Sequence, residues 1–171
     1  MKEKSQGFAT LSGVKVETFS RFCEWMYKES YAIPLPVKCK TTSNDIEQID
    51  SEEHTHVYLA LAELYVFAQE RDVKGLKPFV LGNLTKESVN TKPGKRCINI
   101  HDLVQFVYQH TSPASGKELE PLRAFTMSFC ADGLSLSHLT DHNMQKVLRA
   151  SDTDLMTDYL LMLGRKTKGL D

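Results

Sequence analysis

The sequence predicts a mainly helical fold with one or two short strands and a helical extension at its C-terminal end. Apolar residues return every three or four positions through most of the chain, which is the period of a helix with one buried face. Proline and glycine interrupt these periodic segments and mark turns between them. Only two short runs, residues 8–11 and 31–35, have the features of strands.

The composition is that of a globular protein. The chain has 171 residues, of which 41% are apolar and 25% charged, and its net charge is −1. These values suit one domain, or one domain with an extension, and they lack the Lys/Arg excess of a duplex-binding protein. The most apolar window, residues 57–68, is too short to span a bilayer, and the N-terminal residues do not form a signal peptide. We therefore expect a cytoplasmic or nuclear protein without a membrane partner, whose four cysteines are reduced thiols.

An amphipathic helix is predicted over residues 16–28, between the two short strands. Its polar residues face away from one apolar side, so one face is expected to be buried. The strand at residues 31–35 is expected at a sheet edge because prolines close it. The apolar face of the helix consists of Val16, Phe19, Phe22, Cys23, Met26 and Tyr27.

An acidic loop is predicted after the second strand, within residues 38–55. Residues 41–55 contain five acidic residues and no lysine or arginine. Such a segment buries too little apolar surface to offset the entropy lost on ordering, so we expect it to be mobile.

Two closely joined helices are predicted next. Residues 56–70 are apolar around most of the helix circumference, so this helix should be buried nearly all round. The following helix has Val73, Leu76, Val80 and Leu84 on its inner side. Pro78 should either kink this second helix or mark a late start, and the two helices should form an αα-hairpin.

The second half of the chain is predicted to be helical after a loop at residues 86–97. Helices are expected over residues 101–111 and from residue 119 to Asp132-Gly133, with Pro121 in a first turn, where proline is tolerated. Two short helices should follow. One carries Met144, Val147 and Leu148. The other carries the apolar residues of positions 155–163, with Ser151 or Asp152 as its N-cap and Gly164 as its C-cap.

No metal or cofactor site is predicted. His54 and His56 form the closest histidine pair, beside two glutamates, but structural zinc usually needs four ligands at set spacing. His138 and His142 are four residues apart, and the residues between them favour a helix cap over one shared face. The glycines are isolated, so the sequence contains neither a P-loop nor a dinucleotide-binding motif.

We predict a protein without enzymatic activity, with two alternatives from other classes. Cys130, with a histidine such as His138, would be the nucleophile of a helical enzyme fragment, but its position beside apolar residues favours a buried thiol. A basic cluster of Lys92, Lys95 and Arg96 would serve a nucleic-acid accessory protein. It lacks interleaved aromatic residues, so a solvated loop is the simpler interpretation.

Several segments together resemble the fungal form of the BTB/POZ domain. Glu3-Lys4-Ser5-Gln6 before the first strand is similar to the "E-x-S-Q" opening of that segment in the family. Residues 16–31 resemble its "F-x-x-F-L-x-W-L-Y-x-x-x-Y" helix, and residues 61–76 resemble its next "L-Y-x-L-A-D-K" helix. Residues 104–111 and Pro121-Leu122-Arg123 are similar to its following helices. The match covers most of residues 3–130.

The resemblance implies the C-terminal half of a BTB/POZ fold. A partial α+β domain would occupy residues 1–86, and a helical extension would occupy residues 98–166. The opening strand, helix and hairpins of the family would precede Glu3, so the chain would be a fragment, a truncated product or a divergent short form. Family members act as adaptors or scaffolds without enzymatic activity. Because the missing half normally covers apolar surface, self-association is also expected.

The expected partner is a protein that the sequence does not name. Glu24, Lys28 and Tyr31 are the candidate contacts, on the exposed side of the helix at residues 16–28. A cullin-type ubiquitin ligase is the alternative partner, for which the chain would be a substrate adaptor. Cullin-binding members often carry a hydrophobic-x-Glu motif in the acidic-loop region, and Ile46-Glu47 and Ile49-Asp50 do not reproduce it.

Overall fold

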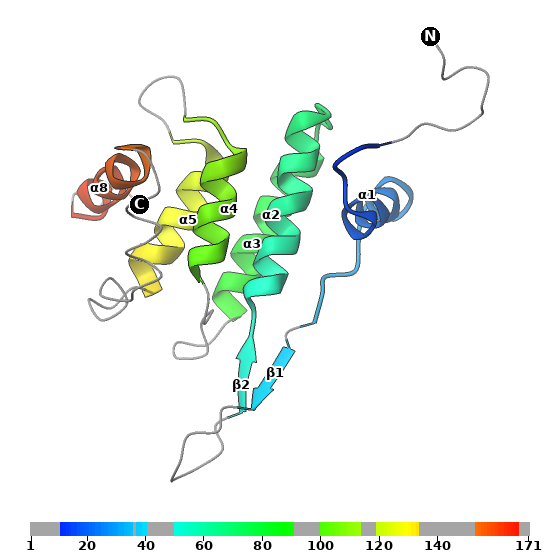
Figure 1. Cartoon of the computed structure of the whole chain (residues 1–171), viewed down its shortest axis with the longest axis horizontal. Coiled ribbons are helices and arrows are strands. Elements are labelled where there is room, and N and C mark those ends of the chain that lie inside the picture. Colours follow the sequence, from blue (N-terminus) through cyan, green and yellow to red (C-terminus); the bar gives the residue numbers. More distant parts are fainter. Residues whose placement is uncertain are drawn as a thin grey trace. The chain divides into compact units, whose positions relative to one another are not determined.

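In a computed structural model, the described part of the chain is mainly helical. It comprises residues 11–35, 37–40, 50–90, 100–113, 119–133 and 153–167. These residues contain six helices and one two-stranded hairpin (Figure 1). The chain divides into two units, Met1–Ala32 and Ile33–Asp171. The predicted helical class is confirmed, whereas the BTB/POZ assignment within that class remains a prediction.

Helix α1 (Val16–Lys28) belongs to the first unit and has the predicted bounds. Glu17 lies in its first turn and Lys28 in its last, so both charges complement the helix dipole. The helix ends at Glu29, which has a left-handed backbone conformation (φ 52°) and whose N–H donates to the carbonyl of Trp25 at 2.8 Å. This geometry reverses the chain without a glycine.

The strand predicted over residues 31–35 is wrong, because these residues have no regular structure. Two backbone groups of this segment, which would pair with a neighbouring strand if it were a strand, form hydrogen bonds with side chains. The N–H of Ala32 donates to the Glu24 carboxylate at 2.9 Å, and the carbonyl of Leu35 lies 2.6 Å from Nε2 of His56. The other predicted strand falls on residues 8–11, of which residues 8–10 lie outside the described part and Leu11 is not in a strand.

The residues at the two ends of the predicted acidic loop form a two-stranded hairpin. Strand β1 (Val37–Lys40) pairs antiparallel with strand β2 (Asp50–Glu53). Lys38 is the register partner of Glu52, and Lys40 is the register partner of Asp50. The prediction over residues 38–55 was therefore wrong at its ends, while residues 41–49 lie outside the described part.

Helices α2 (Thr55–Glu70) and α3 (Leu76–Asn90) form the predicted hairpin of the second unit. Ten residues of α2 are buried, so burial nearly all round is confirmed. Pro78 lies in the first turn of α3, where backbone N–H groups have no partner within the helix. Its late start is therefore confirmed. The helix extends to Asn90, so the predicted loop at residues 86–97 begins too early.

Helices α4 (Ile100–His110) and α5 (Pro121–Gly133) have nearly the predicted bounds. Helix α8 (Thr153–Thr167) runs through Gly164, so the C-cap predicted at that glycine is wrong. The helix predicted at residues 144–148 lies outside the described part.

Within the second unit, the helices form a layer with α8 on its outside. Helix α2 packs against α3 and α4, α5 packs against α3 and α4, and α8 packs against α5 (Figure 1). The main core therefore lies among the first four of these helices. Its largest fully buried side chains include Tyr58, Leu61, Leu64, Tyr65, Leu76, Leu84, Leu103 and Leu122.

Candidate protein-interaction surface

The three predicted contact residues lie near the C-terminal end of α1. Lys28 is exposed in the last helical turn, and Tyr31 is partly buried just beyond it. Glu24 is also partly buried, and its carboxylate accepts the hydrogen bond from Ala32. Glu24 therefore holds the segment after the helix against α1, which makes it a structural residue of this surface. Lys28 has the exposure expected of a contact.

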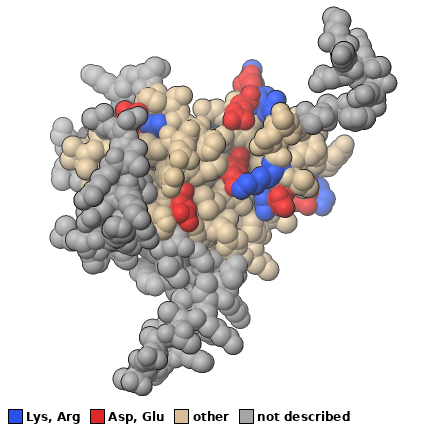
Figure 2. All heavy atoms as spheres, in the orientation of Figure 1, with Lys and Arg blue, Asp and Glu red and all other residues tan. Residues whose placement is uncertain are grey.

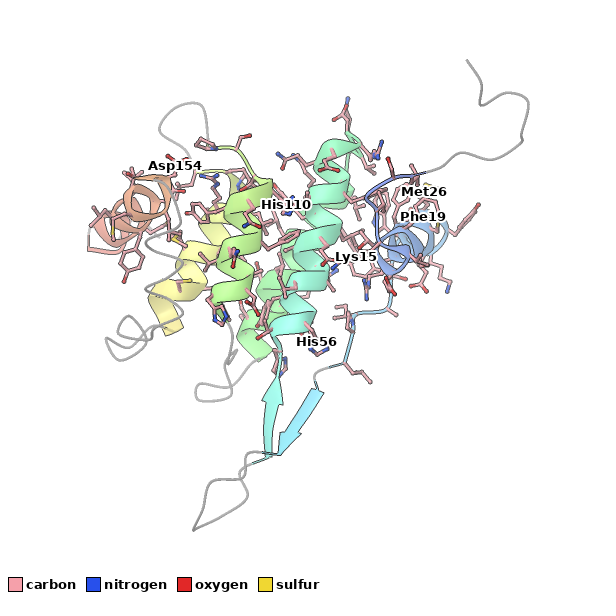
Figure 3. All side chains as sticks on the ribbon, viewed as in Figure 1. Lys15, Phe19, Met26, His56, His110 and Asp154 are labelled. Atoms are coloured by element: carbon pink, nitrogen blue, oxygen red, sulfur yellow. The ribbon has the colours of Figure 1, made fainter. Side chains whose placement is uncertain are left out.

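Two exposed side chains beside Lys28 were missed by the sequence analysis. Tyr27 is 84% exposed and Met26 is 52% exposed, although both were predicted on the buried face. Val16 and Phe19 of that face are exposed as well, and the buried residue of α1 is Thr18, so the predicted burial of this face is wrong. Neighbouring residues of a helix point about 100° apart, so two consecutive positions cannot both lie at the centre of one face. That spacing argued against burial of both residues, but no local signal indicated that both are exposed. We call Met26, Tyr27 and Lys28 the α1 patch (Figure 3, where Met26 is labelled).

A second exposed apolar surface lies on the outer side of α8. Met156 is 48% exposed and Leu160 is 60% exposed, and these residues are four apart, so they lie on one side of the helix. Leu161 is also 48% exposed. The inner side of α8 is buried, with Leu155 and Met162 at 3% and 5% exposure. This helix is therefore apolar on two sides.

Charges of both signs are mixed on the face shown in Figure 2. Acidic and basic side chains of the described residues lie next to one another there. On this face, the described residues form no extended patch of one sign. The basic cluster at residues 92–96, the basis of the nucleic-acid alternative, lies outside the described part.

A buried arginine, which the sequence analysis quoted only as part of the resemblance, connects α4, α5 and α8. Arg123 donates from Nε to Oγ1 of Thr111 at 2.9 Å and from Nη2 to the Thr111 carbonyl. Its Nη1 lies 3.6 Å from Asp158 and 3.7 Å from Asp154. Its guanidinium carbon lies 4.4 Å from the ring centre of Tyr108, whose hydroxyl donates to Asp158 at 2.8 Å. We call these five residues the Arg123 cluster.

The available signal for this cluster was the position of Arg123 on its helix. Leu119, Leu122 and Thr126 recur at the spacing of an inward-facing stripe, and Arg123 falls within that stripe. A charged residue at a core position requires partners, because an unpaired buried charge is costly. The sequence does not identify those partners, since Asp154 and Asp158 lie more than 30 residues away.

Glu120 connects α5 to α2. One carboxylate oxygen accepts the N–H groups of Leu122 and Arg123 at 2.9 and 3.0 Å, so Glu120 caps the start of α5. The other accepts the hydroxyl of Tyr65 at 2.6 Å. Tyr65 is fully buried on α2, and this hydrogen bond satisfies its hydroxyl.

The two tyrosines bonded to carboxylates are hydrogen-bond donors in the folded chain. Burial, and then the hydrogen bond to Glu120, raises the pKa of Tyr65 above its ordinary value. Burial and the hydrogen bond to Asp158 raise the pKa of Tyr108 in the same direction. Both hydroxyls therefore stay protonated at neutral pH, which suits a structural donor and does not suit a general base.

The other candidate residues do not converge on a reactive centre in the described part. Cys130 is 2% exposed and packs in an apolar cluster, and its imagined partner His138 lies outside the described residues. His54 is buried, and His56 bonds to the Leu35 carbonyl. Across the described ranges, no group of three or more histidine, cysteine, aspartate or glutamate residues could hold a metal ion. No described helix is long and apolar enough to cross a membrane.

No protein-family model, curated protein or solved structure matches this chain. The resemblance to the BTB/POZ family therefore stays a prediction.

Proposed function

We propose that this chain is a protein–protein interaction module of the BTB/POZ type, which acts as an adaptor or scaffold and catalyses no reaction. The α1 patch carries the proposal. A tyrosine that is 84% exposed and a methionine that is 52% exposed lie beside an exposed lysine. Tyrosine and methionine are enriched in protein interfaces, and tyrosine is frequent among the residues that dominate binding energy.

The free energy expected from burying its apolar side chains supports a binding role for the α1 patch. Burying a large apolar side chain contributes about 1.5–3 kcal/mol. Each 1.4 kcal/mol or so changes a dissociation constant about tenfold. Covering Met26 and Tyr27 would therefore change the affinity for a partner substantially, because both side chains still expose half or more of their surface.

The arrangement of the polar residues also supports an interaction module. The Arg123 cluster and the Glu120 contact use their charged groups to connect helices. The tyrosines with shifted pKa values are hydrogen-bond donors in those same contacts. The polar interactions of the buried helices therefore have structural roles.

The test is quantitative affinity purification with the full chain and two variants. Tyr27→Ala changes the α1 patch, and Val89→Ala is the matched control, because Val89 is 79% exposed on a different helix. We expect Tyr27→Ala to lose the partners that the wild type and Val89→Ala retain, while circular dichroism shows the same helix content in all three. Equal recovery of every partner by both variants would refute the proposal.

Two defined probes distinguish the kinds of adaptor. A purified cullin N-terminal domain tests the ubiquitin-ligase alternative directly, and its binding would identify a substrate adaptor. Light scattering on the isolated chain tests self-association. A stable monomer at all concentrations would show that the partner of the α1 patch is a different protein.

A further inference from the structure

Among the described residues, helix α8 contacts the second unit along one side. Leu155, Asp158 and Met162 form its buried stripe and recur at three and four residues. The opposite side exposes Met156 and Leu160. Among the described elements, α8 packs mainly against α5, whereas α2 is enclosed by several helices.

The apolar contact between α8 and the other described helices has few fully buried side chains, with Tyr159 packed against it in a partly buried position. One cluster of buried residues joins α4, α5 and α8, and the described part of α8 contributes two buried apolar side chains to it, Leu155 and Met162. The members from α4 and α5 are Val104, Met127 and Cys130. The main core lies among the other helices, so loss of α8 would leave it largely intact.

The polar contact that holds α8 is unbalanced in charge. One guanidinium from α5 faces two carboxylates from α8, and α4 supplies the Tyr108 hydroxyl to Asp158. Among the described residues, Nη1 of Arg123 has no hydrogen-bond partner, and its carboxylate distances of 3.6 and 3.7 Å are long for an ion pair. The side chain of Asp158 is 11% exposed, whereas that of Asp154 is 45% exposed.

Such a cluster stabilises the attachment of α8 only modestly. Removing ions from water is costly, and their attraction repays that cost only when the geometry is good and every donor is satisfied. When α8 separates, water hydrates Arg123 and both aspartates, which recovers part of this cost. Local opening is expected where few apolar contacts hold an element.

We propose that α8 is a releasable strap, which detaches from α5 while helices α2 to α5 stay folded, and that the Asp158–Arg123 contact controls how often it detaches. Detachment would expose Cys130, Met127 and Val104 on the α4–α5 surface. The inference goes beyond the proposed function and does not depend on the α1 patch.

Cys130 provides a direct reporter, because it is 2% exposed and packs in the same cluster as α8. The experiment measures the rate at which a thiol reagent labels the full chain, with Cys23, Cys39 and Cys97 replaced by serine. At low urea, we expect the labelling rate of Cys130 to be at least about tenfold higher than the rate that global unfolding alone would allow. This rate should be nearly independent of the urea concentration. Circular dichroism on the same protein measures the global unfolding.

A matched pair of substitutions tests the role of Asp158. Asp158→Asn removes the buried charge and keeps an acceptor for Tyr108, so labelling should accelerate about tenfold while the global unfolding midpoint moves little. Asp154→Asn removes the exposed carboxylate beside the same guanidinium and should change labelling less than about threefold. Labelling that occurs only at the global unfolding rate, with the same urea dependence, would overturn the proposal.

Hydrogen exchange on the unmodified chain makes the same test without cysteine substitutions. The amides of α8 should exchange with a lower opening free energy than those of α2, and this energy should not vary with low urea. Equal opening free energies in α8 and α2 would show that α8 is an integral part of the core.

Discussion

Replacing Tyr65 by phenylalanine removes one hydroxyl from the contact between α2 and α5. That hydroxyl donates to Glu120 at 2.6 Å, and Tyr65 has no exposed surface. A hydrogen bond to a charged acceptor contributes about 1.5–3 kcal/mol. We therefore expect Tyr65→Phe to lower the free energy of unfolding by about 2 kcal/mol. For a chain of this length, that corresponds to a decrease of about 4–8 °C in Tm.

Glu120→Ala should lower the free energy of unfolding more than Tyr65→Phe does, because it removes two contacts at once. It eliminates the acceptor for Tyr65 and also the cap of α5, which contributes about 1 kcal/mol. The expected loss is about 3 kcal/mol. In the double variant the shared hydrogen bond is lost only once, so the coupling energy of the cycle should be about 1.5–2 kcal/mol.

The assay is urea unfolding followed by far-ultraviolet circular dichroism. Tyr27→Phe is the matched control, because that ring is 84% exposed and its hydroxyl should change stability by less than about 0.5 kcal/mol. The reasoning would be refuted if Tyr65→Phe were as stable as this control. A coupling energy near zero would equally contradict a direct contact between Tyr65 and Glu120.

Three further predictions concern the buried parts of the second unit. Arg123→Met should destabilise the chain by about 1.5–3 kcal/mol in urea, because it removes the charged donor of two hydrogen bonds to Thr111, which connect α5 to the end of α4 whether or not α8 is attached. A variant as stable as the wild type would contradict these buried contacts. Leu64→Ala should cost about 2–5 kcal/mol, whereas Leu160→Ala on the outer side of α8 should cost less than about 0.5 kcal/mol; similar losses would contradict the burial assigned to α2. Stability should also fall in alkali. Because the pKa of Tyr108 is raised in the folded chain, the unfolded chain loses this proton first, near pH 10 or so. The contribution is therefore fully present below that pH and is lost as the pH rises. Tyr108→Phe should reduce the slope of unfolding free energy against pH there by about 1.4 kcal/mol per unit, and an unchanged slope would exclude the shift.

The helices were predictable because their signal is local. Apolar residues at a spacing of three and four indicated α1, α2, α4 and α5, and the structure has all four near the expected bounds. The hairpin of β1 and β2 was not predictable in this way. Lys38 and Lys40 on β1 are the register partners of Glu52 and Asp50 on β2, and this pairing joins two segments that are separated in the sequence. Considered alone, the acidic segment has the composition of a disordered loop.

The contact residues named from the sequence stay a prediction, but the structure shows how each of them is exposed or bonded. Lys28 is exposed as expected, but Glu24 bonds to the backbone of Ala32, a contact eight residues along the chain that depends on the reversal at Glu29. The periodicity assigned Tyr27 to the buried face, because an apolar residue at the edge of a helical stripe looks the same as one at its centre. The Arg123 cluster joins residues that only tertiary packing brings together.

Photo-cross-linking from position 27 tests the central claim, that the α1 patch binds a protein, most directly. A photo-reactive phenylalanine analogue replaces Tyr27 in the full chain, and the control carries the same analogue at Val89, which is similarly exposed on α3. We predict discrete cross-linked products from position 27, with a partner protein or a second copy, in clear excess over those from position 89. The same weak and diffuse products from both positions would contradict a binding role for the α1 patch.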